Sequence, residues 1–308
     1  MRIRGIRQVA TDVNSYELVP ADGRLLPAFT AGAHIDVQVP NGMVRQYSLH
    51  GNPADRSAWH IAVKREMAGR GGSASLHDFA EVGSALGIVG PRNHFPLAAG
   101  AKRHLFIAGG IGITPLYAMA QALSARDERW DLHYCARTPD HAAFYNELQS
   151  LRGGSVTPHF SEVPTLDVTT LLHEEPEGTH LYCCGPAGLM KAVETASRHW
   201  APGTVHFEWF AAPVTDHPAN QPVEVELARS SIILLVPAER SILQVVRENG
   251  IYVECACEEG VCGTCETAVL DGEPQHRDML LSPEERAGNR TMMICVSRAN
   301  SKRLVLDL

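Results

Sequence analysis

Four cysteines near the C-terminal end have the spacing of a metal-ligand set. They are Cys257, Cys262, Cys265 and Cys295. The first three follow a C-x4-C-x2-C pattern, which is the plant-type arrangement for a [2Fe–2S] cluster, with a fourth thiolate from a later segment. Gly260 and Gly263 lie within the loop, where the absence of a side chain lets backbone N–H groups approach the sulfides. The spacing therefore predicts a centre that carries one electron at a time.

A zinc site is the alternative for the same thiols. Structural zinc sites usually combine two short C-x2-C pairs, and only Cys262 and Cys265 form one here, so the cluster is favoured. Cys255 lies just before the loop and is expected to be a partly buried thiol rather than a ligand. Cys135 and Cys183 fall within apolar strand patterns and receive the same interpretation.

Two glycine-bearing segments in the middle of the chain are candidates for binding a pyrophosphate. The run GGIGITP, from Gly109 to Pro115, passes from an apolar strand into a helix, so backbone N–H groups gather at the positive helix end. Cys184-Gly185-Pro186 ends a later strand of the same predicted sheet. Because ligands bind beyond the carboxyl ends of parallel strands, both segments are expected to face one crevice. Glycines that serve only close packing are the alternative.

The N-terminal third contains a second candidate anion site. Arg45 lies on a predicted strand, and Gly71-Gly72-Ser73 precedes a predicted helix. An arginine can bind a phosphate through two hydrogen bonds, and the turn adds backbone donors and a hydroxyl. A solvated arginine and an ordinary turn are the alternatives for each feature alone. Together in one domain the two features favour a site for a flavin phosphate.

The composition limits the classes of function. A net charge of −8 and a pI near 6.0 argue against a nucleic-acid partner, because such proteins concentrate lysine and arginine. The start of the chain lacks the apolar core of a signal peptide, and no apolar run approaches the ~18–20 residues that span a membrane. We therefore expect a cytoplasmic protein with no membrane partner, whose eight cysteines are not structural disulfides.

The elements that must position these residues suggest three domains in a chain of 308 residues. Short β-rich runs over residues 1–100 predict an antiparallel β-barrel that binds the flavin. Alternating strands and helices over 101–211, including a helix at HAAFYNELQSL, predict a parallel-sheet α/β domain that binds NAD. Residues 212–221 have the composition of a linker. Residues 222–308 are expected to form a β-grasp ferredoxin domain, with VEVELA and SIILLVP paired and Ser241 capping the helix SILQVVREN.

The order of the motifs carries a family resemblance. RQYSL, GRGGS, GGIGITP, CCGP, FEWF and the cysteine pattern follow one another over essentially the whole chain. This set resembles the phthalate dioxygenase reductase type of iron–sulfur flavoprotein, within the ferredoxin–NADP reductase superfamily. The resemblance implies that NADH reduces a flavin and that single electrons leave through the cluster to a Rieske-type oxygenase. It also implies a monomer that binds FMN, and FMN is favoured over FAD because no clear aromatic platform for an adenine is visible.

The resemblance further implies roles for individual residues. The flavin site would comprise Arg45, Tyr47, Ser48, Leu49, Gly71, Gly72 and Ser73. The dinucleotide site would comprise Gly110, Gly112, Thr114, Cys184, Gly185 and Pro186. Within these sets, Arg45 would bind the flavin phosphate, Tyr47 would pack on the isoalloxazine and Ser48 would lie near flavin N5. Cys184 and Gly185 would lie near the nicotinamide, which makes Ser48 and Cys184 the catalytic candidates. The four cysteines of the C-x4-C-x2-C…C pattern would be the cluster ligands.

The coenzyme preference depends on the segment Ala136–Asp140. Asp140 could accept a hydrogen bond from a free ribose hydroxyl and would repel a 2′-phosphate, whereas Arg137 favours the phosphate. We expect NADH. Two other functions stay open: a reductase for another acceptor, such as a diiron hydroxylase or a cytochrome, and a non-enzymatic redox sensor or zinc-stabilised interaction module.

Hydride and electron transfer require no general acid or base, since the cofactors carry the chemistry. The 15 histidines are therefore expected to be surface residues or satisfied interior residues. They include His34, His50, His77 and His94.

Overall fold

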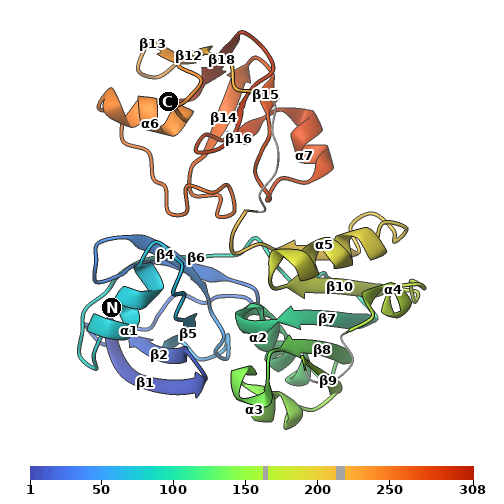
Figure 1. Ribbon diagram of the computed structural model, residues 1–308. Helices are drawn as coiled ribbons and strands as arrows, with labels where there is room; N and C mark the ends of the chain where they lie inside the picture. Colours follow the sequence, from blue (N-terminus) through green and yellow to red (C-terminus); the bar gives the residue numbers. More distant parts are fainter. Residues whose placement is uncertain (162–165, 213–218) are drawn as a thin grey trace. The chain divides into compact units, whose positions relative to one another are not determined.

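The computed structural model describes residues 1–161, 166–212 and 219–308, and the chain divides into two compact units (Figure 1). The first unit is Met1–Phe210 and the second is Ala211–Leu308. Most of the predicted linker, residues 213–218, lies outside the described residues. Within the described ranges no helix combines the length and the apolar character needed to cross a membrane.

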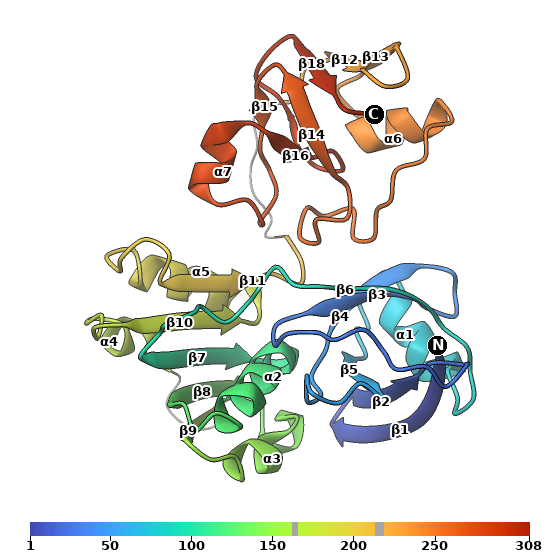
Figure 2. The same ribbon diagram turned by 180° about the vertical axis from the view of Figure 1, so that it is seen from behind.

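The first part of unit 1 is a barrel of six antiparallel strands (Figure 2). They are β1 (Arg2–Ala10), β2 (Val13–Val19), β3 (His34–Gln38), β4 (Val44–Ser48), β5 (Trp59–Lys64) and β6 (Gly87–Arg92). The sheets β1-β2-β5 and β4-β3-β6 are joined by the single bridges Arg2–Ala85 and Leu49–Ile61, which close the barrel. Leu49 and Ile61 have no exposed surface, because alternate residues of each strand point inward.

The second part of unit 1 is a five-stranded parallel sheet. Its strands are β7 (Arg103–Gly109), β8 (Trp130–Ala136), β9 (Gly154–Phe160), β10 (Thr179–Cys184) and β11 (Val205–Glu208), in the order β11-β10-β7-β8-β9. β7 and β10 are neighbours, and the chain leaves them in opposite directions. Their carboxyl ends therefore form a topological switch point, which is where ligands of such sheets bind. The predicted parallel α/β fold is confirmed.

Helices cover both faces of this sheet (Figure 1). The short helix η1 (Gly110–Gly112) leads into α2 (Ile113–Ser124), which packs with α3 (Tyr145–Gln149) on one face, and α4 (Val168–Leu171) packs with α5 (Ala187–Ala196) on the other. Gln121 Nε2 on α2 donates a hydrogen bond of 2.7 Å to the carbonyl of His50, so the sheet and the barrel pack as one unit.

The helix predicted at HAAFYNELQSL is shorter than expected. Phe144 has a positive φ of 60°, which a helix cannot include, so α3 begins only at Tyr145. The ring of Phe144 is buried and stacks on Tyr117 at a centroid distance of 4.8 Å. Tertiary packing therefore overrides the local helical pattern at this point.

Unit 2 is a mixed sheet with a helix packed on it. Its strands are β12 (Val223–Leu227), β13 (Ile232–Val236), β14 (Glu266–Asp271), β16 (Thr291–Met293) and β18 (Arg303–Leu306), in the order β13-β12-β18-β14-β16. β15 (Pro274–Gln275) pairs with β17 (Arg298–Ala299), and α7 spans Pro283–Gly288. The predicted pairing of β12 with β13 is confirmed. So is the cap of α6 (Ile242–Glu248), where Ser241 Oγ accepts a hydrogen bond from the Gln244 backbone N–H.

Candidate functional site

The predicted phosphate cradle forms where β4 meets α1 (Gly72–Phe79). Arg45 lies against the helix start, since a Cβ on Gly72 would lie 2.8 Å from Arg45 Nε. Gly71 caps the helix in the left-handed region, with φ 87°, and its carbonyl accepts a hydrogen bond from Asn41 Nδ2 at 3.2 Å. Ser73 Oγ accepts a hydrogen bond of 3.0 Å from the Glu66 backbone N–H. The structure thus brings together a guanidinium and a helix N-terminus, which suits a phosphate.

The rest of the RQYSL segment divides between the barrel interior and the end of β4. The side chain of Leu49 is fully buried in the barrel core, Ser48 is buried at the end of β4, and Tyr47 is more exposed than either. Tyr47 is half-buried, and this burial raises the pKa of its hydroxyl well above the ordinary value. A neutral phenol ring can pack against a planar heterocycle without bringing a charge to it.

A carboxylic acid links the end of β4 to the end of β11. Ser48 Oγ donates a hydrogen bond of 3.1 Å to Glu208 Oε2. Removal from water raises the pKa of Glu208 to about 8, although the Ser48 hydrogen bond opposes this effect. The side chain is therefore largely protonated at neutral pH. This residue lies in the FEWF motif, but no individual role for it followed from the sequence.

Cys184 lies beside the same carboxyl group, at the end of β10. Its thiol is fully buried, and burial raises its pKa well above the ordinary value, with a further contribution from Glu208. A thiol that stays protonated is a poor nucleophile. Cys184 is therefore not suited to covalent chemistry. The structure places the two catalytic candidates, Ser48 and Cys184, next to the same residue, Glu208.

The two glycine-bearing loops of the parallel sheet meet at the switch point. A Cβ on Gly112 would lie 2.2 Å from the carbonyl oxygen of Cys184, and one on Gly109 would lie 2.5 Å from Pro186 Cδ. Side chains at these positions would force the loops apart. Thr114 is buried and its hydroxyl donates to the Ile111 carbonyl at 3.1 Å, so it braces the turn between η1 and α2. The structure thus brings the two segments together at the switch point, where glycines let their backbones pack closely.

The segment proposed to set the coenzyme preference follows β8 on this edge of the sheet. Arg137 comes directly after β8, and its carbonyl accepts a hydrogen bond from Ser161 N–H at 3.2 Å. Asp140 lies in η2 (Pro139–His141), where its carbonyl accepts a hydrogen bond of 2.8 Å from Thr11 of the barrel. The backbone of both residues is therefore fixed, and their side chains remain candidates for the ribose site.

Five thiols, rather than the predicted four, converge in unit 2. The sulfur of Cys257 forms hydrogen bonds with Cys262 and Cys295, and the sulfur of Cys255 does so with Cys265 and Cys295. These contacts lower the pKa of Cys255 and Cys257, because the neighbouring thiols donate to them, and raise the pKa of Cys295. A set of soft, partly ionised sulfur ligands fits an iron–sulfur cluster.

Glycines shape the loop around these thiols. Gly260 and Gly263 both have positive φ, 71° and 75°. A Cβ on Gly260 would lie 2.6 Å from Val296 Cγ2, next to Cys295, so the two segments that carry the thiols can approach only at a glycine. The Glu259 N–H donates to Cys257 Sγ at 3.2 Å, which is the kind of backbone bond expected around a cluster sulfur.

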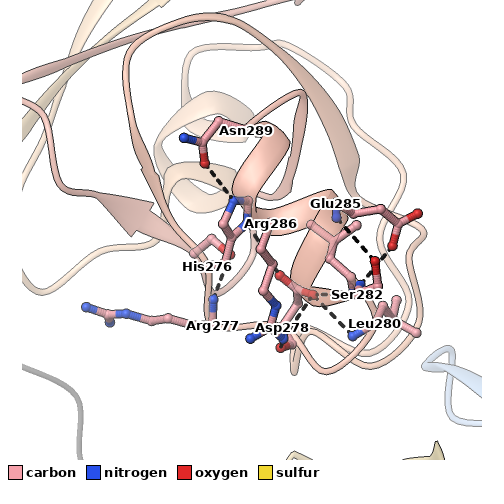
Figure 3. Close-up of polar contacts among 10 residues, drawn as sticks. His276, Arg277, Asp278, Leu280, Ser282, Glu285, Arg286 and Asn289 are labelled. Carbon is pink, nitrogen blue, oxygen red and sulfur yellow. Dashed lines mark hydrogen bonds and ion pairs between the residues drawn. The ribbon is translucent and has the colours of Figure 1, made fainter. Parts of the chain in front are cut away.

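A buried polar network holds the segment that packs on Gly260 (Figure 3). Asp278 is 1% exposed, and its Oδ2 accepts hydrogen bonds from the N–H groups of Leu280 and Leu281 at 3.1 and 2.8 Å. Arg286 of α7 donates to the Asp278 carbonyl, and the Met279 N–H donates to the Gly260 carbonyl at 2.9 Å. This network, which sequence reasoning did not identify, fixes the chain opposite the cysteine loop.

Interior histidines make structural contacts with their neighbours. His50 Nε2 is 3.1 Å from Ser15 Oγ, and His77 Nε2 is 2.8 Å from the Val63 carbonyl. His34 stacks on His94 at 5.6 Å, but its buried Nε2 has no hydrogen-bond partner among the described residues. Burial lowers the pKa of His50 to about 3 and that of His34 to about 4, so both are neutral.

Comparisons with known proteins agree with this arrangement. Residues 106–195 match the oxidoreductase NAD-binding domain, and residues 225–300 match the 2Fe-2S iron-sulfur cluster binding domain. The chain is 46% identical to a vanillate O-demethylase oxidoreductase of Pseudomonas sp. (strain HR199 / DSM 7063), covering 99% of this chain and 98% of that protein.

Two solved structures extend the comparison over the full chain. Phthalate dioxygenase reductase, described as a modular structure for electron transfer from pyridine nucleotides to [2Fe–2S], matches with a TM-score of 0.73 and 42% identity over 100% of this chain and 97% of its own. A self-sufficient cytochrome P450 monooxygenase matches with a TM-score of 0.94 and 40% identity over 100% of this chain and 40% of its own.

The barrel, the parallel sheet with its glycine-bearing loops and the cysteine-rich domain define a modular reductase. This chain belongs to the phthalate dioxygenase reductase family of iron–sulfur flavoproteins. It is an oxidoreductase that passes electrons from a pyridine nucleotide through a flavin to a [2Fe–2S] cluster.

Proposed function

We propose that the protein oxidises NADH, holds FMN in its barrel and delivers single electrons from the cluster to a terminal oxygenase. The observation that carries the nucleotide-to-flavin step is the 3.1 Å bond between Ser48 and Glu208. It joins the barrel strand of the proposed flavin site to the sheet edge of the proposed nicotinamide site. One carboxylic acid therefore orders both sides of the position where hydride would pass.

The protein's own groups bind and orient, while the cofactors supply the redox chemistry. A bound flavin supplies the conversion of a two-electron hydride into single electrons. Arg45 and the start of α1 neutralise a phosphate, and glycine N–H groups at η1 donate hydrogen bonds to a pyrophosphate. Ser48 is held by Glu208 and can orient a ring nitrogen, while the neutral Cys184 packs against the other ring. Such positioning is the protein's main contribution to rate.

Cys257, Cys262, Cys265 and Cys295 are the proposed cluster ligands. All four lie in one group of contacting sulfurs, and Gly260 and Gly263 give the loop its curvature. Iron and acid-labile sulfide analysis of the purified protein tests this assignment together with single serine substitutions of the four cysteines. Retention of the full cluster in any one of these variants would remove that cysteine from the ligand set.

FMN is proposed because the cradle combines a helix N-terminus with Arg45, which fits one terminal phosphate. Tyr47 is the aromatic residue placed next to Arg45 on β4, and its proposed role is to pack on the flavin ring. Heat release of the flavin followed by chromatography decides between the two cofactors. FMN is the expected product, and FAD would overturn this part of the proposal.

NADH is proposed as the coenzyme because Asp140 offers an acceptor for a ribose hydroxyl. Steady-state kcat/KM with NADH and NADPH tests the preference, with NADH expected to be the better substrate. Asp140→Asn should reduce the difference in kcat/KM between NADH and NADPH, because the repulsion of a 2′-phosphate is lost. A higher kcat/KM with NADPH in the wild-type protein would show that Arg137 governs the pocket.

An oxygenase component is the proposed electron acceptor, and the protein is proposed to act as a monomer. Support comes from relatives named as reductase components of oxygenases, such as phthalate dioxygenase reductase of Burkholderia cepacia. A cytochrome is the second candidate, because the matching P450 monooxygenase carries a similar module within its own chain. Reconstituted turnover with purified oxygenase components and with a P450 distinguishes the two. Substrate oxidation with the P450 alone would replace the oxygenase proposal.

A further inference from the structure

Cys255 takes part in a second, overlapping group of thiols. Its Sγ and those of Cys265 and Cys295 all lie within 4.8 Å of one another. Cys265 and Cys295 are buried, and Cys255 is half-buried. In the described part of the chain this is the one group of three or more histidine, cysteine or acidic side chains with such spacing. Cys255 is partly buried as expected, but its place beside two of the proposed cluster ligands was not predicted.

The spacing of this trio suits a single metal ion. Zinc–thiolate bonds are ~2.3 Å, so two sulfurs on one tetrahedral ion lie about 3.8 Å apart. Sulfurs within 4.8 Å reach this separation by small side-chain rotations. Cys257 and Cys262 instead contact each other, and Cys257 also contacts Cys295. One group is this trio, and the other is the proposed set of four cluster ligands. Cys265 and Cys295 belong to both groups.

We propose that Cys255, Cys265 and Cys295 form a mononuclear site for a thiophilic divalent cation, with Zn²⁺ as the natural candidate and water as the fourth ligand. Binding forms three metal–thiolate bonds, releases to solvent the protons that the thiols still carry, and moves no electron. Because two of the thiols also belong to the proposed cluster set, the ion and the cluster exclude each other. The predicted competition depends on the proposed cluster ligands. Binding of the single ion does not depend on them.

Cobalt titration of the full-length protein tests the site, after removal of the cluster with a chelator and with the flavin retained. Wild-type protein should bind one Co²⁺ with intense tetrahedral bands at wavelengths beyond the flavin absorption. Cys255→Ala should weaken Co²⁺ binding about tenfold or more, since loss of a direct ligand costs at least as much as loss of a supporting residue. The same variant should still be isolated with its [2Fe–2S] cluster.

Cys257→Ala should behave in the opposite way, losing the cluster and keeping the Co²⁺ site. Cys135→Ala removes a half-buried thiol from unit 1 and serves as the matched control. Equal Co²⁺ affinity in wild type and Cys255→Ala would overturn the proposal, as would equal weakening by Cys257→Ala. Circular dichroism checks folding, and Cys255→Ser is the second variant if the alanine variant does not fold.

Cluster reconstitution gives a second readout. Zn²⁺ should slow the rebuilding of the cluster from iron and sulfide in wild type and have little effect in Cys255→Ala. The same inhibition in both proteins would contradict the shared-ligand site. If wild-type protein never holds a cluster, the proposed ligation fails, while the Co²⁺ titration still decides on the mononuclear site.

Discussion

Glu208 is the residue whose environment differs most from that of an ordinary surface carboxylate. Its pKa is raised to about 8 by removal from water, against 4.5 in the unfolded chain. Between these two values the folded protein binds the extra proton, so the free energy of unfolding falls as pH rises from about 4.5 to 8. Above that range Glu208 makes no further contribution to the pH dependence.

Glu208→Gln should remove this contribution. We expect the melting temperature of the wild type, measured from pH 5.5 to 8.5, to fall relative to that of the variant as pH rises. Glutamine keeps the size of the side chain and can still accept from Ser48. Glu194→Gln, at an exposed position on α5, is the control. A difference that stays constant across this range would show that Glu208 is already ionised in the folded protein.

Arg45 should determine how tightly the flavin is held. Arg45→Ala removes a cation beside the start of α1, and a charge-assisted hydrogen bond contributes ~1.5–3 kcal/mol, or about ten- to a hundredfold in Kd. The flavin-to-protein ratio after gel filtration should fall. Arg4→Ala is the control, because Arg4 lies on β1 and pairs with Glu17. An unchanged ratio would show that Arg45 does not bind the flavin phosphate.

The sequence was most informative where chemistry depends on spacing. The cysteine pattern and the glycines predicted which segments converge, because few structures other than cofactor sites need those residue types so close together. Glu208 and Asp278 were not identified, since a lone acidic residue in a sequence carries no sign of its burial. The inward direction of Cys255 also depends on the folded path of the loop.

Among the elements, the cysteine loop depends most on one glycine. Gly260→Ala places a methyl group 2.6 Å from Val296 at a φ of 71°, so it combines overpacking with backbone strain. We expect a loss of about 1–3 kcal/mol in stability of unit 2 and a reduced iron content. Gly288→Ala, whose Cβ would lie no closer than 3.9 Å to Arg290 Cγ, should match wild type in both measurements. Equal iron content in both variants would contradict the close approach of the two segments.

Strands and helices followed their sequence patterns closely except where packing intervened. The pairing of β12 with β13 and the cap of α6 were predicted because their signals are local. The helix α3 was predicted too long, because the local pattern gives no sign of the positive φ of Phe144, whose ring stacks on Tyr117.

For the whole molecule, electrons are expected to pass from the nucleotide to the flavin, then to the cluster and finally to the partner protein. Each unit carries one part of this chemistry, with the flavin and nucleotide residues in unit 1 and the thiols in unit 2. A substitution in the cluster loop should therefore leave flavin reduction intact. Cys262→Ser should lose electron transfer to a protein acceptor and largely keep NADH-dependent reduction of ferricyanide.

Anaerobic rapid mixing with NADH tests this order most directly, with flavin absorbance, cluster absorbance and the electron paramagnetic resonance signal recorded together. In wild type the flavin should bleach first, and the signal of the reduced [2Fe–2S] cluster should then grow. In Cys262→Ser the flavin should bleach at an unchanged rate and no cluster signal should appear. Reduction of the cluster in flavin-depleted Arg45→Ala protein, or equal loss of both steps in a folded Cys262→Ser variant, would contradict the account.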